Sequence, residues 1–483
     1  MRVLIVKLSA MGDVVHCLPL AARIKERLPN VELTWLVEPA AQDLLTGNPA
    51  VDRVLLFPRK AWLKEMRKVG PLISTFGAAK KYFQELKDFK FDLAIDAQGL
   101  LKSAIPTYLS GAPLRVGFAG TREGAAKLLT HALEVGDYFA PDRHVVELNM
   151  ALADFALETL AQERSTCIRL ADRDRVVHFP LPDPGDAATA FVSSKLDNLG
   201  LAPVTEPHQS SETTPAEAPK TERESFPLTK SEAPEAGQSL VQGEAPINSK
   251  SPKSGPLIAL IPGTTWPTKI WPDDQWIALG RILCERLGAR LVLVGGPGDR
   301  GTNQYIYKGI ESAGKNPTAK NSTGINSTGV NQNGNSLIDL TGETSLMQLV
   351  ALFKRCDLVL GADTGPLHLA AAIAHEAFNS EVAAREPKAL KNTAHRKSLE
   401  FEVQSVAVAK PKVVAIHGAT PWLRNGPYGS MGSAVHLNLD CQPCFEKTCH
   451  LKLNTKSKSI PCLKDLPVEE VFKAVDKALA KKI

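Results

Sequence analysis

The sequence predicts an α/β protein with two Rossmann-like domains that face each other across a cleft. Two observations support this fold class. Short apolar, β-branched runs recur along the chain and alternate with helical patterns, which is typical of parallel sheets covered by helices. The chain also has 483 residues, more than a single hydrophobic core usually accommodates. Two domains are therefore the simplest division.

Each domain is expected to contain one parallel sheet. The first set of strands is predicted at residues 3–8, 31–37, 53–57 and 91–97, and the second at 257–263, 289–296, 356–363 and 412–418. Two helices of the second domain have clear boundary signals. One opens at Pro272 and stops at Gly288, and the other opens at Ser345 and ends near Lys354.

Three stretches interrupt this alternation. Residues 203–254 are rich in Pro, Glu, Ser and Thr and have Phe226 as their single aromatic residue, which predicts a disordered linker. Residues 312–336 form an Asn/Ser/Thr/Gly tract and are expected to be a surface loop insertion. Residues 376–409 are interpreted as an inserted excursion on a loop. The predicted domains are therefore 1–202 and 255–483, and the second carries both insertions.

Composition narrows the functional class. The net charge of +5 is weak and dispersed, which argues against a nucleic-acid partner but suits an acidic substrate. No run approaches the roughly 18 consecutive apolar residues that indicate a membrane-spanning helix. The N-terminus also lacks the pattern of a secretory signal. A cytoplasmic protein is expected.

Four polar stretches follow predicted strands, at the sheet edge where α/β proteins bind ligands. They are SAMGD (9–13), DAQGLLKS (96–103), PGTTWPTKIWP (262–272) and GADTGPLH (361–368). In the last of these, the chain turns at Gly365 and Pro366 opens a helix, whose unpaired N–H groups can bind a diphosphate. For this motif alone, helix capping by Asp363 or Thr364 is an equally good explanation.

Two further groups have chemically useful positions. Thr264, Thr265 and Lys269 lie close together after a strand, so that two hydroxyls and an ammonium can converge on a phosphate chain. A solvated lysine in a polar loop is the alternative. Asp13 stands at the turn between the first strand and its helix. Its carboxylate can act as a general base toward an acceptor hydroxyl or can cap the helix.

Two motif matches are interpreted as coincidental. Gly296, Gly298 and Gly301 spell the G-x-G-x-x-G of dinucleotide-binding proteins, but Pro297 intervenes and no helix-packing pattern follows. Nicotinamide or flavin binding is therefore disfavoured. The Asp-Arg-Asp at 172–174 resembles the D-x-D metal motif found in some sugar transferases, but it lies among charges that favour a solvated surface.

Four of the eight cysteines cluster near the C-terminus. Cys441, Cys444, Cys449 and Cys462 have the spacing C-x2-C-x4-C-x12-C. The opening pair suits zinc or an iron–sulfur cluster, whereas the later spacings match no standard ligand pattern. Reduced cysteines in an irregular loop are the alternative.

Taken together, the motifs resemble glycosyltransferase family 9, the lipopolysaccharide heptosyltransferases, and within it most closely the heptosyltransferase I group. The matching stretches are MRVLIVKLSAMGDVVHCLPL at the start, IDAQGLLKSA (95–104), TTWPTKIWP (264–272) and GADTGPLHLAAA (361–372). The likeness covers nearly all of the chain outside the three insertions. It implies a GT-B fold with an N-terminal acceptor domain and a C-terminal nucleotide-sugar domain.

The resemblance also implies a reaction that requires no cofactor. Heptose would move from ADP-L-glycero-D-manno-heptose to an octulosonic acid (Kdo) sugar on lipid A, with inversion. Asp13 matches the catalytic base of the family. The donor contacts would be Thr264, Thr265, Lys269, Asp299, Asp363, Thr364, Gly365 and His368. The expected partners of the acidic acceptor are Lys7, Lys102, Arg122 and Arg143.

Some alternatives stay open. Residues 57–83 place basic residues around Trp62, Leu63 and Met66, which predicts either peripheral contact with an anionic inner-membrane surface or a helix packed on the sheet. A related transferase that adds a second heptose or another sugar would share the phosphate site. A nucleotide-sugar-binding protein without chemistry would keep residues 264–269 but would not need a base at Asp13.

Overall fold

The computed structural model describes residues 1–67, 72–164, 176–200, 255–313, 336–385, 410–429, 431–451 and 460–480. Outside these ranges lie the predicted excursion after residue 385, the whole linker, most of the Asn/Ser/Thr/Gly tract and the Asp-Arg-Asp motif. Within the described ranges, no helix combines the length and the apolar character needed to cross a membrane.

The first half is built on a six-stranded parallel sheet in the order β3-β2-β1-β4-β5-β6. The central strand β1 pairs with β2 and β4, so that Val3 lies opposite Leu33 and Leu93. The four strands predicted from the sequence are present, with shorter bounds, whereas β5 and β6 were missed. The strands are β1 (Arg2–Val6), β2 (Glu32–Val37), β3 (Arg53–Leu56), β4 (Leu93–Asp96), β5 (Leu114–Phe118) and β6 (His131–Leu133).

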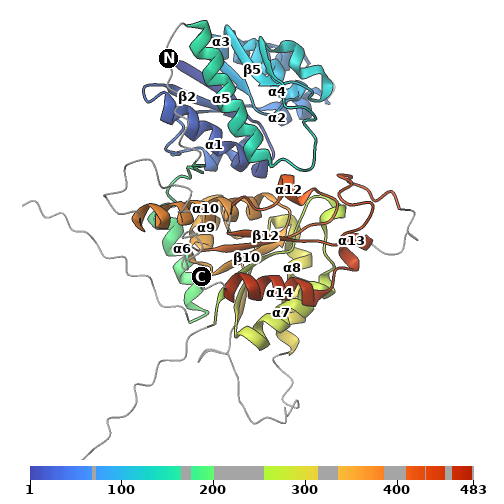
Figure 1. Cartoon of the computed structure of the whole chain (residues 1–483). Helices are drawn as coiled ribbons and strands as arrows, with labels where there is room; N and C mark the ends of the chain where they lie inside the picture. The colour runs from blue at the N-terminus through green and yellow to red at the C-terminus, as the bar shows by residue number, and fades with distance from the viewer. Residues whose placement is uncertain are drawn as a thin grey trace, which may run out of the picture. The chain divides into compact units, whose positions relative to one another are not determined.

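Helices cover both faces of this sheet (Figure 1). Alternate side chains of β1 enter different cores: Val3 and Ile5 pack with α1 and α5, whereas Leu4 and Val6 pack with Leu86 of α3. The helices of this half are α1 (Met11–Arg27), α2 (Arg59–Met66), α3 (Leu72–Asp88), α4 (Leu101–Leu109) and α5 (Val145–Glu163), with short 3-10 turns at Pro39–Leu44 and Arg122–Leu128.

The second half repeats the plan with the strand order β12-β11-β10-β7-β8-β9, all parallel. Again the four predicted strands are present, and the short β9 and β12 were missed. Their bounds are β7 (Leu257–Ile261), β8 (Arg290–Leu293), β9 (Leu337–Asp339), β10 (Leu358–Ala362), β11 (Lys412–Ile416) and β12 (Gly432–Val435). Two such sheets confirm the predicted fold class.

The boundary signals of two helices in this half are confirmed. Helix α7 ends where Gly288 adopts a left-handed φ of 60°. The hydroxyl of Ser345 caps α9 by accepting from the N–H of Gln348 at 3.2 Å. The helices are α7 (Asp273–Leu287), α8 (Arg300–Ala313), α9 (Leu346–Arg355), α10 (Gly365–Arg385), α12 (Trp422–Asn425), α13 (Pro461–Lys464) and α14 (Val468–Ala480), with 3-10 turns at Pro267–Lys269 and Pro297–Asp299.

Helix α6 (Gly185–Asp197) precedes the linker but packs against α9 of the second half (Figure 1). The segment before α6 is also hydrogen-bonded to the second half. The carbonyl of Val177 accepts from His375 Nε2 at 3.0 Å and from Asn379 Nδ2 at 2.9 Å, and both donors belong to α10. The chain therefore crosses to the second sheet before residue 202, and the domain division drawn from the sequence stays a prediction.

The expected start of the excursion at residue 376 is wrong. Helix α10 continues without a break to Arg385, so the first ten residues of the predicted excursion are helical. Its side chains at these positions, including those of Glu376 and Asn379, contact the segment before α6. These tertiary contacts extend the helix beyond its alanine-rich part.

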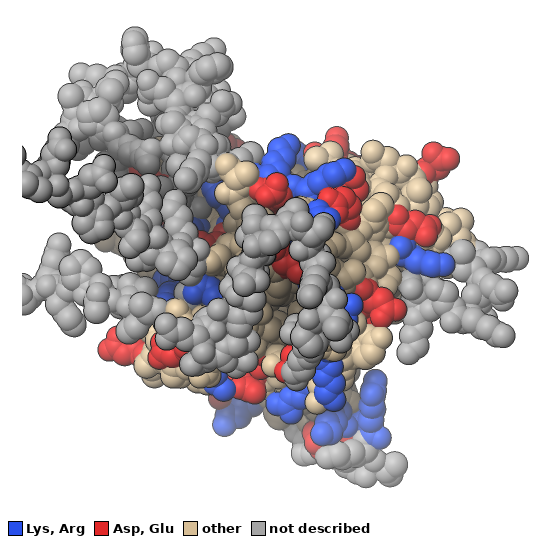
Figure 2. Space-filling model, turned by 90° about the horizontal axis from the view of Figure 1, so that it is seen from below, with Lys and Arg blue, Asp and Glu red and all other residues tan. Residues whose placement is uncertain are grey.

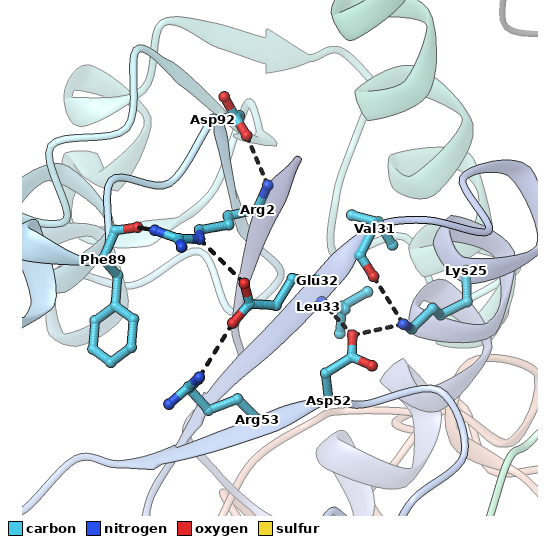
Figure 3. Close-up of polar contacts among 9 residues, drawn as sticks. All are labelled: Arg2, Lys25, Val31, Glu32, Leu33, Asp52, Arg53, Phe89 and Asp92. Atoms are coloured by element: carbon cyan, nitrogen blue, oxygen red, sulfur yellow. Dashed lines mark hydrogen bonds and ion pairs between the residues drawn. The ribbon is translucent and has the colours of Figure 1, made fainter.

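Ion pairs between side chains connect the N-terminal ends of β1, β2 and β3 (Figure 3). Arg2 Nε pairs with Glu32 Oε2 at 3.1 Å, and the other oxygen of Glu32 lies 3.3 Å from Arg53 Nη2. Asp52 accepts from the N–H of Leu33 and pairs with Lys25. On the face drawn in Figure 2, charges of both signs are interspersed, in keeping with the dispersed charge of the sequence.

Candidate functional site

A cavity of about 1100 Å³ lies where the carboxyl ends of strands from both sheets approach each other. The structure brings twelve of the predicted site residues to its wall: Asp13, Lys7, Lys102, Arg122, Thr264, Thr265, Lys269, Asp299, Asp363, Thr364, Gly365 and His368. Arg143 is not among the lining residues. It is exposed, and its guanidinium donates to the carbonyl of Val135 at 3.5 Å.

Asp13 is in the first turn of α1 and is half-buried at the cavity wall. The N-cap of the helix is Ala10, and Asp13 stands at the third helical position, where its Oδ2 accepts from the backbone N–H of Ala10 at 3.0 Å. A carboxylate has a second oxygen and several acceptor positions. Capping therefore leaves Asp13 able to accept a proton from a ligand in the cavity.

Two lysines of the first half lie near this carboxylate. Lys7 is buried and donates to the carbonyl of Ala97 at 2.8 Å. Burial works to lower the pKa of Lys7, but negative groups around it, Asp13 foremost, raise that pKa above its usual value. Lys102 donates to Ser9 Oγ at 2.8 Å, and burial lowers its pKa. Lys7 thus supplies a fixed positive charge beside Asp13.

In the second half, Asp363 organises the wall of the cavity. Its Oδ2 lies 2.8 Å from Lys269 Nζ, and its Oδ1 lies 2.9 Å from His368 Nε2. Burial works to raise the pKa of Asp363, but the hydrogen bond from His368 and the charge of Lys269 hold it well below its usual value. Both carboxylate oxygens therefore contact the protein itself, and Asp363 acts on a ligand through Lys269 and His368.

The N-terminus of α10 forms an anion site next to this pair. The Thr364 hydroxyl is buried, and among the described residues it has no hydrogen-bond partner. The first turn of this 21-residue helix has unpaired N–H groups, and the partial positive charge of the helix lies at the same place. With Thr264, Thr265 and the Lys269 ammonium on the opposite loop, this wall can bind a diphosphate.

The glycine run at 296–301 does not form a dinucleotide site. Asp299 Oδ2 accepts from the N–H of Gly296 at 2.8 Å, so a donor that a pyrophosphate would require is already in use. Asp299 also approaches Gly263 so closely that a Cβ atom there would lie 2.4 Å from its Cγ. The carboxylate of Asp299 is thereby held at the cavity wall, where it can accept hydrogen bonds from hydroxyl groups of a ligand.

The two halves meet beside the site through the predicted His368 and through two histidines that the sequence analysis missed, His16 and His144. A Cβ atom on Gly12 would lie 2.7 Å from His368 Cδ2, so only glycine permits this approach. The His16 ring lies 4.2 Å from the His368 ring and 5.6 Å from the His144 ring. His16 stands one helical turn after Asp13, and this i, i+3 spacing was the signal that could have revealed it.

The buried imidazoles of His144 and His417 predict a pH-dependent stability. Burial lowers the pKa of His144 and of His417 to about 4. The unfolded chain, with ordinary histidine pKa values near 6.5, then binds more protons than the folded chain between about pH 4 and 6.5. The unfolding free energy should therefore be highest above pH 6.5 and fall as the pH drops, by up to about 1.4 kcal/mol per pH unit for each histidine.

Urea unfolding at pH 7.5, 6.0 and 5.0 measures this slope. The His417→Asn variant should show a shallower slope than the wild type, because one buried imidazole is gone. His450 is exposed, so His450→Asn is the matched control and should keep the wild-type slope. Equal slopes for the three proteins would contradict the assignment of the pH dependence to His417.

The four C-terminal cysteines, with His450, line a small cavity of about 10 Å³. They are free thiols, and burial, followed by the three neighbouring cysteines, raises the pKa of Cys462 to about 12. Within the described part of the chain, no group of three or more His, Cys, Asp or Glu side chains is arranged to hold a metal ion. The zinc or iron–sulfur interpretation thus gains no geometric support and stays a prediction.

The basic segment after β3 packs in part on the fold, and its predicted contact with a membrane surface stays a prediction. Arg59 and Lys60 pair with the buried Glu38 at 3.0 and 3.2 Å, and the Trp62 ring packs against Phe57 and Tyr82. The side chains of Leu63 and Met66, in contrast, are 41% and 37% exposed. One side of α2 is thus part of the fold, and two apolar side chains face solvent.

Comparisons with known proteins agree with this architecture. The model of "Glycosyltransferase family 9 (heptosyltransferase)" matches residues 79–205 and 218–377. Lipopolysaccharide heptosyltransferase 1 of Pseudomonas aeruginosa is 24% identical over 454 residues, which are 93% of this chain and 87% of that protein. Lipopolysaccharide heptosyltransferase 1 of Escherichia coli K12 is 33% identical over 150 residues, which are 30% of this chain and 44% of that protein.

Among solved structures, E. coli heptosyltransferase WaaC with ADP superposes with a TM-score of 0.56 at 18% identity, covering 99% of this chain and 100% of the other. At this identity the likeness establishes the fold, two parallel-sheet α/β halves of the GT-B type.

Proposed function

Because the chain belongs to glycosyltransferase family 9, the heptosyltransferases, and is therefore a glycosyltransferase, we propose that it transfers heptose from ADP-L-glycero-D-manno-heptose to a Kdo sugar of the lipopolysaccharide inner core. The observation that carries this proposal is the single cavity that joins a diphosphate wall to a carboxylate flanked by cations. The names of the relatives, and the ADP in the WaaC complex, support the choice of sugar and nucleotide.

The donor diphosphate is assigned to the second half. One side of the diphosphate would contact Thr264, Thr265 and the Lys269 ammonium. The other side would contact Thr364 and Gly365 at the start of α10. As the glycosidic bond breaks, the leaving ADP gains negative charge, which these donors stabilise without a metal ion. Asp363 and His368 position Lys269, and Asp299 receives hydroxyl groups of the nucleotide sugar.

The acceptor is assigned to the first half. Asp13 removes the proton of the acceptor hydroxyl while that oxygen attacks the anomeric carbon from the side opposite to ADP. The new carbon–oxygen bond forms as the bond to the phosphate oxygen breaks, ADP departs with the electron pair, and the anomeric configuration inverts. Lys7, Lys102 and Arg122 line the approach for an acidic sugar, and Arg143 lies outside the wall as a contact for more distant acceptor groups.

No cofactor takes part in this reaction as proposed. Metal bound by Cys441, Cys444, Cys449 and Cys462 would have a structural role, because these residues line a separate small cavity behind Thr268. Measuring metal content in the purified protein would decide that point.

We further propose that the protein works at the cytoplasmic face of the inner membrane, where a lipid A acceptor is anchored. Two features support peripheral contact with lipid. Leu63 and Met66 project from a helix that also carries Lys64, and α4 has an exposed apolar stripe next to the cavity residue Lys102. The stripe consists of Leu101, Ile105, Tyr108 and Leu109.

The proposal is tested by supplying the purified protein with ADP-heptose and two acceptors, lipid A that bears Kdo and the same acceptor already carrying one heptose. Transfer to the first acceptor, with release of ADP, is the expected result. Transfer confined to the second acceptor would support the alternative of a second-heptose transferase. A third outcome is that the protein binds ADP but transfers sugar to neither acceptor, from ADP-heptose or from any other ADP- or UDP-sugar. That outcome would support a non-catalytic nucleotide-sugar-binding protein.

A further inference from the structure

One buried arginine at the cavity wall has no role in the reaction described above. Arg424 belongs to the short helix α12 of the second half and is 5% exposed, yet it lines the cavity. Its Nη1 atom is buried, and among the described residues it has no hydrogen-bond partner. A buried guanidinium with an unused donor is costly unless a ligand satisfies it.

The surroundings of Arg424 indicate which ligand that is. Its guanidinium carbon lies 5.1 Å from the centre of the Tyr138 ring, which belongs to the first half. Its side chain also hydrogen-bonds to the Tyr138 hydroxyl, and the carboxylates of Asp13 and Asp137, likewise from the first half, act on it electrostatically. No ion pair within 4.0 Å joins it to a carboxylate in the described part of the chain. The groups that contact or act on Arg424 thus include the proposed base and other residues of the acceptor half.

The segment that carries Arg424 is also fixed against the first half. His144 Nε2 bonds to the carbonyl of Gly426 at 3.0 Å, and the His144 ring packs on Tyr428 at 4.9 Å. This anchoring, together with Tyr138, holds the guanidinium in one place before any ligand binds. A planar guanidinium held in this way is suited to a bidentate pair with a carboxylate.

We propose that Arg424 forms a carboxylate subsite, through which the second half recognises the acid group of the acceptor sugar next to the hydroxyl that Asp13 deprotonates. This assignment rests on the proposed function, because an octulosonic acid carries its carboxylate on the same ring as the reacting hydroxyl. Arg424 is then a specificity residue. It selects acidic acceptors, since an acceptor without the carboxylate leaves the buried Nη1 atom without its charged partner.

The test compares two acceptors, a Kdo glycoside on a lipid A anchor and the same compound with its carboxyl group converted to the carboxamide. For the wild type, kcat/KM should be on the order of 100-fold higher for the acid. In Arg424→Met that preference should collapse, with kcat/KM for the acid reduced to the value for the amide and with ADP affinity unchanged. Arg424→Lys should restore part of the preference.

Arg286 provides the matched control, because it is a half-exposed arginine of the same half that pairs with Glu469 far from the cavity lining. Arg286→Met should keep the full preference for the acid. Four outcomes would overturn the carboxylate subsite. They are equal use of the acid and the amide by the wild type, a preference that persists in Arg424→Met, an equal loss in Arg286→Met, and a loss of ADP affinity that accounts for the loss of kcat/KM.

The first of these outcomes needs no variant, so the inference stays testable even if Arg424→Met does not fold. It would also leave the proposed function intact, because the wild type would still transfer heptose. A wild type that transfers heptose to neither acceptor would instead overturn the proposed function and the subsite together.

Discussion

Replacing Asp13 by asparagine should reduce kcat for heptose transfer by about 10²- to 10⁴-fold, the range typical of a lost general base. The amide cannot take the proton of the acceptor hydroxyl at neutral pH. Its side-chain oxygen can still accept the N–H of Ala10, because an asparagine amide keeps one acceptor oxygen. Both the melting temperature and the affinity for ADP should therefore stay at their wild-type values. Steady-state transfer kinetics, calorimetric ADP binding and thermal unfolding measure the three quantities.

Asp13→Ala provides the matched comparison. Alanine removes both the base and the cap, so it should lose activity to a similar extent and also lose about 1 kcal/mol of stability. A pattern in which Asp13→Asn is fully active and only Asp13→Ala is impaired would assign Asp13 to capping alone.

Replacing Asp363 by asparagine should lower both the unfolding free energy and the affinity for ADP. The carboxylate is buried between Lys269 and His368, and breaking a buried pair by neutralising one partner typically costs about 3–5 kcal/mol. Lys269 loses its anchor at the diphosphate wall, so the dissociation constant for ADP should rise by at least about tenfold. Urea unfolding and calorimetric titration with ADP measure the two effects.

Asp357 is the control, because it precedes the same strand, β10, at the end away from the cavity. Its carboxylate accepts from the N–H of Leu257 and pairs with Lys410, and it is partly exposed. Asp357→Asn should therefore lower the unfolding free energy by only about 1 kcal/mol and leave ADP binding unchanged. If Asp363→Asn loses no more unfolding free energy than Asp357→Asn and binds ADP with wild-type affinity, the assignment of an organising role to Asp363 is wrong.

The sequence predicted the central strands well, because their apolar runs are continuous and each is followed by a polar turn. It missed β6 and β9, which have three residues each and carry no alternating or apolar pattern. Such strands form because they pair with neighbours that are distant in sequence, as Leu291 does with Leu337. Local patterns do not contain that information.

The same limit applies to the site. Asp13, Lys269 and Thr364 follow strands in recognisable motifs, so their meeting at one cavity could be predicted. Arg424 and His144 lie in unremarkable stretches and acquire meaning only when the two halves come together. Asp363 was predicted at the cavity wall, but a sequence motif does not show that both of its oxygens contact Lys269 and His368.

Because the chain crosses to the second half before the linker begins, the linker does not connect the two halves. Helix α6 ends at Asp197 and β7 begins at Leu257, and both elements belong to the second half. The acidic stretch between them therefore leaves and re-enters the same half. Its length does not set the distance between Asp13 and the diphosphate wall. The connection whose length does bear on that distance is the one between α5 and α6, because the chain passes from one sheet to the other there.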